Sequence, residues 1–139
     1  MNKKLSHPRI AVTANAFSKN QTLVRALAEN FPNHSLNTKG RYSERELIDV
    51  LKESDGAIVG LDKITDSVLA DCPRVKILAK YGVGLDNLDL EACAKRGVVV
   101  AWEGGVNKRS VAEMTLGFMV GLMRNWYPTS FELKAVTWI

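Results

Sequence analysis

Short runs of apolar residues that do not alternate with polar ones recur along this 139-residue chain. Four are clear, and a weaker one is also present; they lie at residues 9–14, 56–59, 76–79 and 98–101, and near 34–37. Strands buried on both faces have this unalternating pattern, because helices cover both sides of a parallel sheet. Stretches with apolar residues at helical spacing separate the runs. We therefore expect an α/β fold built on a doubly wound five-stranded parallel sheet.

Capping residues predict where the intervening helices begin. Two segments, 43–46 and 110–113, have the spacing of a capping box, in which a Ser oxygen and a Glu carboxylate bind free backbone amides. The first box should open a helix over about 43–51. The second should open a long helix to about Arg124 that is apolar nearly all round and therefore buried on most sides. Other helices are expected over 20–30, 65–70 and 90–96.

Composition excludes several classes of partner. The net charge is +4, but the 19 Lys and Arg residues are scattered, so a nucleic-acid surface is not indicated. Cys72 and Cys93 lack metal-ligand spacing, and we expect two buried thiols in a reducing cytoplasm. The longest apolar run, 114–123, is far short of the ~20 residues of a membrane span. No apolar segment typical of a signal peptide follows the basic start. We expect a cytoplasmic protein with no metal and no membrane partner.

A glycine turn follows the fourth apolar run, in the segment Tyr81-Gly-Val-Gly-Leu-Asp-Asn-Leu-Asp89. Gly82 and Gly84 carry no Cβ, so their backbone amides can approach a small anion closely. The third glycine of a dinucleotide fingerprint is replaced by Asn87, so this turn is not of that type. A second turn, 103–105, follows the fifth run. Both turns should lie at the carboxyl edge of the sheet, where open α/β folds bind ligands. An isolated Gly-x-Gly can also be a purely structural turn.

The order of several motifs resembles one enzyme family. After the glycine turn come Arg96-Gly-Val-Val-Val100, Gly105-Val-Asn107 and Ala112-Glu-Met-Thr-Leu-Gly117. Together they are similar to the D-isomer-specific 2-hydroxyacid dehydrogenases, a family that includes D-3-phosphoglycerate dehydrogenase. The resemblance implies a flavodoxin-like substrate-binding domain over 1–104, without its C-terminal return segment. It also implies an interdomain hinge and the first helix of a truncated NAD-binding Rossmann domain over 105–139.

The family resemblance also implies roles for particular residues. The substrate would be bound by Tyr81, Gly82, Val83, Gly84 and Asn107, with the backbone amides of Val83 and Gly84 on its carboxylate. Val83 and Thr115 would contact the nicotinamide cofactor, NAD. Asp86 and Asn87 are expected to brace the loop.

Other positions depart from the family pattern. Gly60 and Leu61 stand where phosphoglycerate dehydrogenases commonly have an Arg, and Lys63 is the nearest cation, which argues against phosphoglycerate. Trp102 is either an aromatic wall near the pocket or a core residue. The family's catalytic Arg, Glu and His have no match, because His7 and His34 both precede the motifs.

The implied function is therefore the substrate-binding portion of an NAD-dependent oxidoreductase. The full enzyme would transfer hydride between the nicotinamide and a D-2-hydroxy acid or 2-keto acid, whereas the 139-residue chain alone would be inactive. The apolar helix 111–124 implies a homodimer or other self-association. The alternative is a stand-alone small-carboxylate binding or regulatory module. A receiver-type signalling domain is disfavoured, because Asn15, Ala16 and Phe17 replace the acids that it needs after its first strand.

Overall fold

The computed structural model describes residues 7–135. The chain divides into two compact units, one up to Gly104 and one from Gly105 onward, and each is described by itself. The first unit contains the whole sheet and five helices, and the second contains two helices.

Five parallel strands form the sheet of the first unit, in the order β2-β1-β3-β4-β5. Their bounds are β1 Ile10–Val12, β2 His34–Leu36, β3 Gly56–Val59, β4 Ile77–Lys80 and β5 Val99–Ala101. In the register, Ile10 lies opposite both His34 and Gly56. The predicted five-stranded parallel sheet is thus confirmed.

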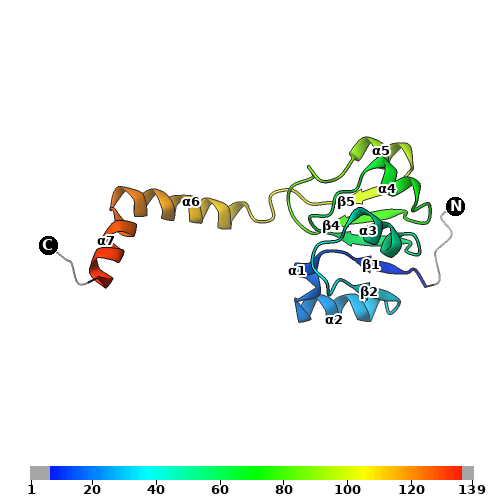
Figure 1. Cartoon of the computed structure of the whole chain (residues 1–139), viewed down its shortest axis with the longest axis horizontal. Coiled ribbons are helices and arrows are strands. Elements are labelled where there is room, and N and C mark those ends of the chain that lie inside the picture. The colour runs from blue at the N-terminus through cyan, green and yellow to red at the C-terminus, as the bar shows by residue number, and fades with distance from the viewer. Residues whose placement is uncertain (1–6, 136–139) are drawn as a thin grey trace. The chain divides into compact units, whose positions relative to one another are not determined.

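Helices cover both faces of this sheet (Figure 1). One face carries α1 (Asn15–Ser18) and α2 (Gln21–Asn30), and the other carries α3 (Glu44–Leu51), α4 (Asp66–Ala70) and α5 (Leu90–Lys95). Two apolar clusters correspond to these faces. The smaller one centres on Val12, Phe17 and Leu27, and the larger one includes Leu51 and Leu78. The layered α/β architecture follows from this two-sided burial.

Side-chain caps fix the starts of four helices in the first unit. Asn20, Ser43, Thr65 and Asp89 each accept hydrogen bonds from backbone amides in the first turn of α2, α3, α4 and α5. Ser43 and Glu46 form the reciprocal contacts of the predicted capping box. These caps set where each strand-to-helix turn ends, and thereby the carboxyl edge of the sheet.

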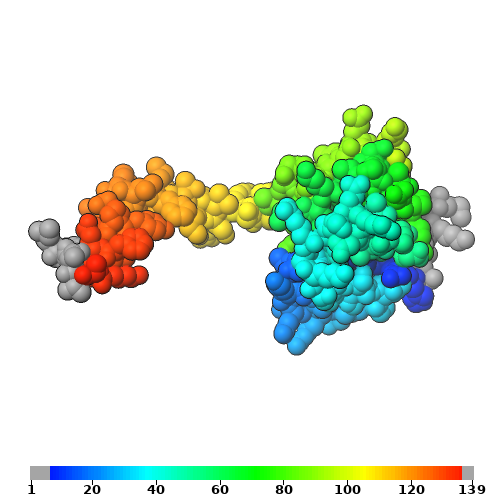
Figure 2. Space-filling view, viewed as in Figure 1, coloured from blue at the N-terminus to red at the C-terminus, as the bar shows by residue number. Residues whose placement is uncertain are grey.

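The second unit contains α6 (Lys108–Met123) and α7 (Trp126–Lys134). In Figure 2, α7 (red) lies against α6 (orange). The prediction of a capping box at Ser110 is wrong. The helix α6 already begins at Lys108, and its N-cap residue, Asn107, makes no side-chain cap hydrogen bond. Glu113 pairs instead with Arg109, at 2.8 Å. Between residues 7 and 135, no helix has the length and apolar character to cross a membrane.

Candidate functional site

The glycine loop begins where β4 ends. The Tyr81 amide donates to the Val59 carbonyl at 2.8 Å, which extends the pairing of β4 with β3 by one residue. Gly82 then turns the chain with φ +137°, a region that favours glycine. Within residues 7–135, the amides of Val83 and Gly84 donate to no protein acceptor, and both residues are exposed. The loop therefore presents two backbone donors at the carboxyl edge of the sheet.

Two side chains tie this loop to the end of β3. Asn87 donates through Nδ2 to the carbonyls of Gly60 and Asp62, at 3.1 and 2.6 Å. The Lys80 ammonium donates to the same Gly60 carbonyl at 2.6 Å and to Asn87 Oδ1. Partial burial lowers the pKa of Lys80, and the negative charges of Asp86 and Asp62 oppose that shift. Asn87 thus braces the loop, as expected.

Trp102 follows β5 and lies over the glycine loop. Its indole N–H donates to the Val83 carbonyl at 3.0 Å, and 46% of the residue remains exposed. A Cβ added at Gly104 would lie 2.8 Å from the indole ring, so only glycine leaves room for this placement. Of the two predicted roles, Trp102 is therefore not a core residue, and its hydrogen bond orients the Val83 peptide.

A cleft of about 620 Å³ adjoins the glycine loop. It is lined by residues 13–16 after β1, residues 60–62 after β3, Gly40 and Arg41 after β2, and Tyr81 after β4. Because β2 and β3 lie on opposite sides of β1, this is the point at which the strand order reverses. Open α/β sheets bind ligands at such points. Tyr81 belongs to both the loop and the cleft, and its ring meets Phe17 edge-on, with centroids 5.5 Å apart.

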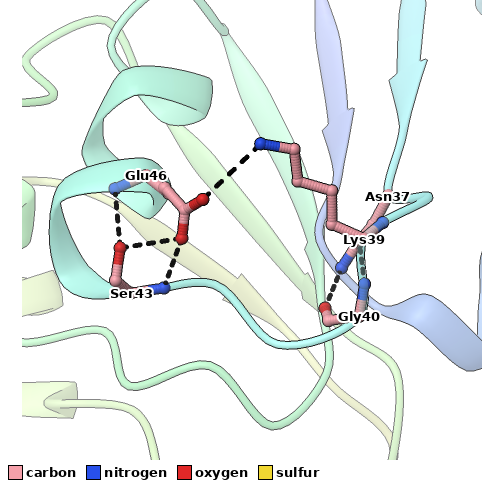
Figure 3. A network of polar contacts seen from close by, with 5 residues as sticks. All are labelled: Asn37, Lys39, Gly40, Ser43 and Glu46. Atoms are coloured by element: carbon pink, nitrogen blue, oxygen red, sulfur yellow. Dashed lines mark hydrogen bonds and ion pairs between the residues drawn. The ribbon is translucent and has the colours of Figure 1, made fainter.

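A hydrogen-bond network shapes the segment that carries Arg41 (Figure 3). The buried Asn37 side chain donates to the Thr13 carbonyl at 2.6 Å and to the Gly40 carbonyl, and it accepts from the amides of Lys39 and Gly40. Lys39 pairs with Glu46 at 3.5 Å, which joins the segment to the start of α3. All the donor and acceptor positions of Asn37 are used, so this segment is held against the end of β1.

The cleft contributes a cation that the sequence reasoning missed. The sequence indicates Lys63 as the nearest cation, but that residue is exposed and does not line the cleft, whereas Arg41 does. The cleft also contains a buried acid, Asp62. Burial raises the pKa of the nearby Tyr42 hydroxyl, and the negative charge of Asp62 raises it further. Only the strand order, which brings four separate segments together, reveals this site.

The remaining predicted site residues lie in the second unit. Asn107 is the N-cap residue of α6, and its carbonyl accepts from the Val111 amide at 3.0 Å. Thr115 is exposed and donates through Oγ1 to the Val111 carbonyl at 2.8 Å. Their roles beside the substrate and the cofactor stay predictions. His34 contacts the Phe31 carbonyl, and His7 is exposed. In the described part of the chain, no group of His, Cys, Asp or Glu could hold a metal.

The fold and the glycine loop define a doubly wound α/β domain with open backbone amides at its carboxyl edge. Residues 10–137 match the catalytic domain of the D-isomer specific 2-hydroxyacid dehydrogenases. The chain belongs to this family.

Relatives of known name support the assignment. The D-3-phosphoglycerate dehydrogenase of Methanocaldococcus jannaschii is 32% identical over 97 residues, which are 69% of this chain and 18% of the relative. The NAD⁺-bound 3-phosphoglycerate dehydrogenase of Entamoeba histolytica is 30% identical with a TM-score of 0.67, over 84% of this chain and 39% of that one. The D-lactate dehydrogenase of Aquifex aeolicus, complexed with NAD and lactic acid, is 25% identical with a TM-score of 0.71, over 94% and 38%. This chain therefore spans less than half the length of each of these relatives.

Proposed function

We propose that this chain is the substrate-binding portion of an NAD-dependent dehydrogenase that acts on a D-2-hydroxy acid or 2-keto acid. The main supporting observation is that the backbone amides of Val83 and Gly84 have no protein acceptor among the described residues. They lie at the carboxyl edge of the sheet, beside a cleft. Two backbone amides without a protein acceptor suit a carboxylate, since hydrogen bonds to a charged group are charge-assisted. Tyr81, Gly82, Val83, Gly84 and Asn107 form the proposed substrate set.

The proposed domain roles follow the two units. Residues 1–104 would bind the acid, and residues 105–139 would be the hinge and the first helix of a Rossmann domain. NAD, when bound in the complete enzyme, supplies or accepts the hydride, and we propose that Val83 and Thr115 contact it. The sequence contains no Gly-x-Gly-x-x-Gly turn, so the residues of this chain do not fit the pyrophosphate. No step through NAD is therefore assigned to the 139-residue chain.

Carboxylate binding can be tested with the 139-residue chain by NMR titration with pyruvate. We expect the backbone amide signals of Val83 and Gly84 to shift most. Gly84→Ala should weaken binding at least tenfold, because its methyl group would stand next to the amide that the carboxylate approaches. The Asp86 side chain, whose Oδ1 lies 2.7 Å from the added Cβ, would only have to turn aside. Gly117→Ala is the matched control, since a Cβ there meets nothing within 4 Å. Unchanged affinity in the Gly84 variant would contradict the proposal.

We further propose that the 139-residue chain alone has no dehydrogenase activity and binds NAD weakly or not at all. Loss of one catalytic acid or base typically lowers the rate by 10²–10⁴-fold, and the family's Arg, Glu and His all lack a counterpart in this chain. The measurement is NADH oxidation with glyoxylate, pyruvate and hydroxypyruvate, together with calorimetric titration of NAD. Turnover above background would refute this part. The stand-alone binding or regulatory module would be favoured by a chain that binds pyruvate without turnover. A longer chain, extended through the nucleotide-binding domain, should then also bind pyruvate and show no turnover.

Self-association through α6 belongs to the same proposal. Four of its apolar residues, Met114, Leu116, Phe118 and Leu122, are each more than half exposed. Contiguous apolar surface of this kind is unusual on a monomer and marks interaction sites. Light scattering should show a homodimer or a larger assembly, and a monomer at high concentration would oppose it. The two buried cysteines, both free, support a reducing compartment such as the cytoplasm.

A further inference from the structure

Asp62 is an unusual lining residue for the cleft at the β1–β3 reversal. Only 8% of the residue is exposed, although its side chain is acidic. Within residues 7–135, its carboxylate accepts no hydrogen bond and joins no ion pair. Its backbone is nevertheless fixed, because the Asp62 carbonyl accepts from Asn87 at 2.6 Å. Asp62 therefore lines the cleft with a carboxylate that has no direct partner among the described residues and whose oxygens keep contact with solvent.

The neighbouring charges do not satisfy this carboxylate. Lys80 interacts with Asp62 electrostatically, but its ammonium donates to the Gly60 carbonyl and to Asn87. The negative charge of Asp62 also raises the pKa of the Tyr42 hydroxyl, because it opposes ionisation of that group. Arg41 lines the cleft, but it is exposed and makes no ion pair in the described part of the chain. Only a small part of Asp62 stays exposed, and its carboxylate oxygens keep some contact with solvent. Such a carboxylate gains from a cation or a donor that pairs with it.

We propose that this cleft takes an ammonium or guanidinium group at the far end of the substrate, with Asp62 as its acceptor. The inference rests on the proposed function, which places the substrate carboxylate at Val83 and Gly84. Tyr81 connects the two positions, since it lies in the glycine loop and also lines the cleft. Its half-exposed ring, held edge-on by Phe17, adds an aromatic face of the kind that attracts cations. The ligand class is a 2-hydroxy or 2-keto acid with a basic terminal group.

Three five-carbon ligands separate the effect of charge from that of chain length. They are (R)-5-amino-2-hydroxypentanoate, (R)-2-hydroxypentanoate and (R)-2-hydroxyglutarate, which end in a cation, a methyl group and an anion. Affinities are measured by NMR titration of the 139-residue chain. We expect the amino ligand to bind about tenfold more tightly than the neutral one, because it forms a hydrogen bond between charged groups with a carboxylate that has no other partner among the described residues. The glutarate should bind no better than the neutral ligand.

Asp62→Asn tests the acceptor, since it keeps the shape of the side chain and removes its charge. The tenfold preference should disappear, while the affinity for (R)-2-hydroxypentanoate stays the same. Asp71→Asn is the matched control, because it changes the net charge equally at an exposed position outside the cleft lining. Preserved dispersion in the amide spectrum verifies that each variant folds.

The other outcomes overturn the inference in distinguishable ways. Equal affinities for all three ligands, with Val83 and Gly84 shifting, refute the cation site and leave the proposed function standing. Tightest binding of the glutarate assigns the cleft to an anion, with Arg41 as its partner, and also refutes the inference. Absence of binding by every ligand, with the glycine-loop amides unshifted, overturns the proposed function together with the inference.

Discussion

In the unit up to Gly104, the side chains of Leu51, Val59 and Leu78 have no exposed surface, whereas Leu122 and Met123 in the unit from Gly105 are 75% and 77% exposed. Both units are rich in apolar residues. The first places them between a sheet and helices, and the second carries them around two helices. Among residues 105–135, only Gly121 is buried. Apolar content thus becomes a core only where a second layer covers it.

The largest expected difference between the units concerns leucine truncation. Leu51→Ala should lower the free energy of unfolding by about 2–5 kcal/mol, since it opens a cavity in the core of the first unit. Leu122→Ala should change it by no more than about 0.5 kcal/mol at protein concentrations too low for the proposed self-association, because the side chain of the single chain is largely exposed. Urea denaturation followed by circular dichroism measures both. A comparable loss in the two variants would mean that partner contacts bury the second unit in solution.

A smaller effect separates a semi-buried carboxylate from an exposed ion pair. Asp55 accepts from the Arg9 amide at 2.8 Å and from Arg74 at 3.0 Å, and both contacts lower its pKa, the Arg9 bond most. Asp55→Asn should therefore lower the free energy of unfolding by roughly 1.5 kcal/mol at pH 7. Glu113→Gln, which breaks the exposed pair with Arg109, should change it by less than about 0.5 kcal/mol.

The pH dependence of the free energy of unfolding tests the same prediction for Asp55. Because the folded-state pKa of Asp55 lies below its unfolded value of about 3.9, its contribution is complete above that pH and is lost as pH falls through the folded pKa. The stability gap between wild type and Asp55→Asn should therefore narrow steadily as urea titrations are repeated from pH 5 downward. A gap that stays constant would show that Asp55 acts through packing alone.

The smallest expected effect distinguishes the two capping-box sequences. Ser43→Ala should reduce the free energy of unfolding by about 1 kcal/mol, because it removes the cap of α3. Ser110→Ala should be neutral or slightly stabilising, since Ser110 lies inside α6 and Ala is the better helix former. Thermal melts of the two variants suffice. Equal losses would restore the capping box at Ser110 in solution.

The same two serines show how far sequence patterns reach. Strands and capped helices of the first unit were predictable because each apolar run is bounded by a recognisable turn or cap, as at Asp89 and Gly97. The prediction of a capping box at Ser110 was wrong because good helix-forming residues also precede Ser110, so α6 can begin at Lys108. Two helices were missed. The four-residue α1 has no side-chain cap, whereas α7 was signalled by Asn125 in a left-handed conformation (φ 55°) and by Pro128 in its first turn.

The glycine loop of the candidate site was predictable, but the cleft beside it was not. Consecutive residues form the loop, so its donors could be inferred from Gly82 and Gly84 alone. The cleft combines segments that follow four different strands. Its charged residues, Arg41 and Asp62, line the same cleft only because of the order of those strands. Periodicity reveals the strands but does not fix their lateral order.

That strand order also bears on how the chain assembles as it is synthesised. β2 pairs with one edge of β1, and β3, β4 and β5 then add one after another at the opposite edge. Each strand emerging from the ribosome therefore meets an edge that already exists, and none has to insert between two paired neighbours. Parallel pairing is intrinsically slow because its contacts are distant in sequence. Because the sheet grows outward from β1, each new strand pairing closes the shortest loop that the connecting helix allows.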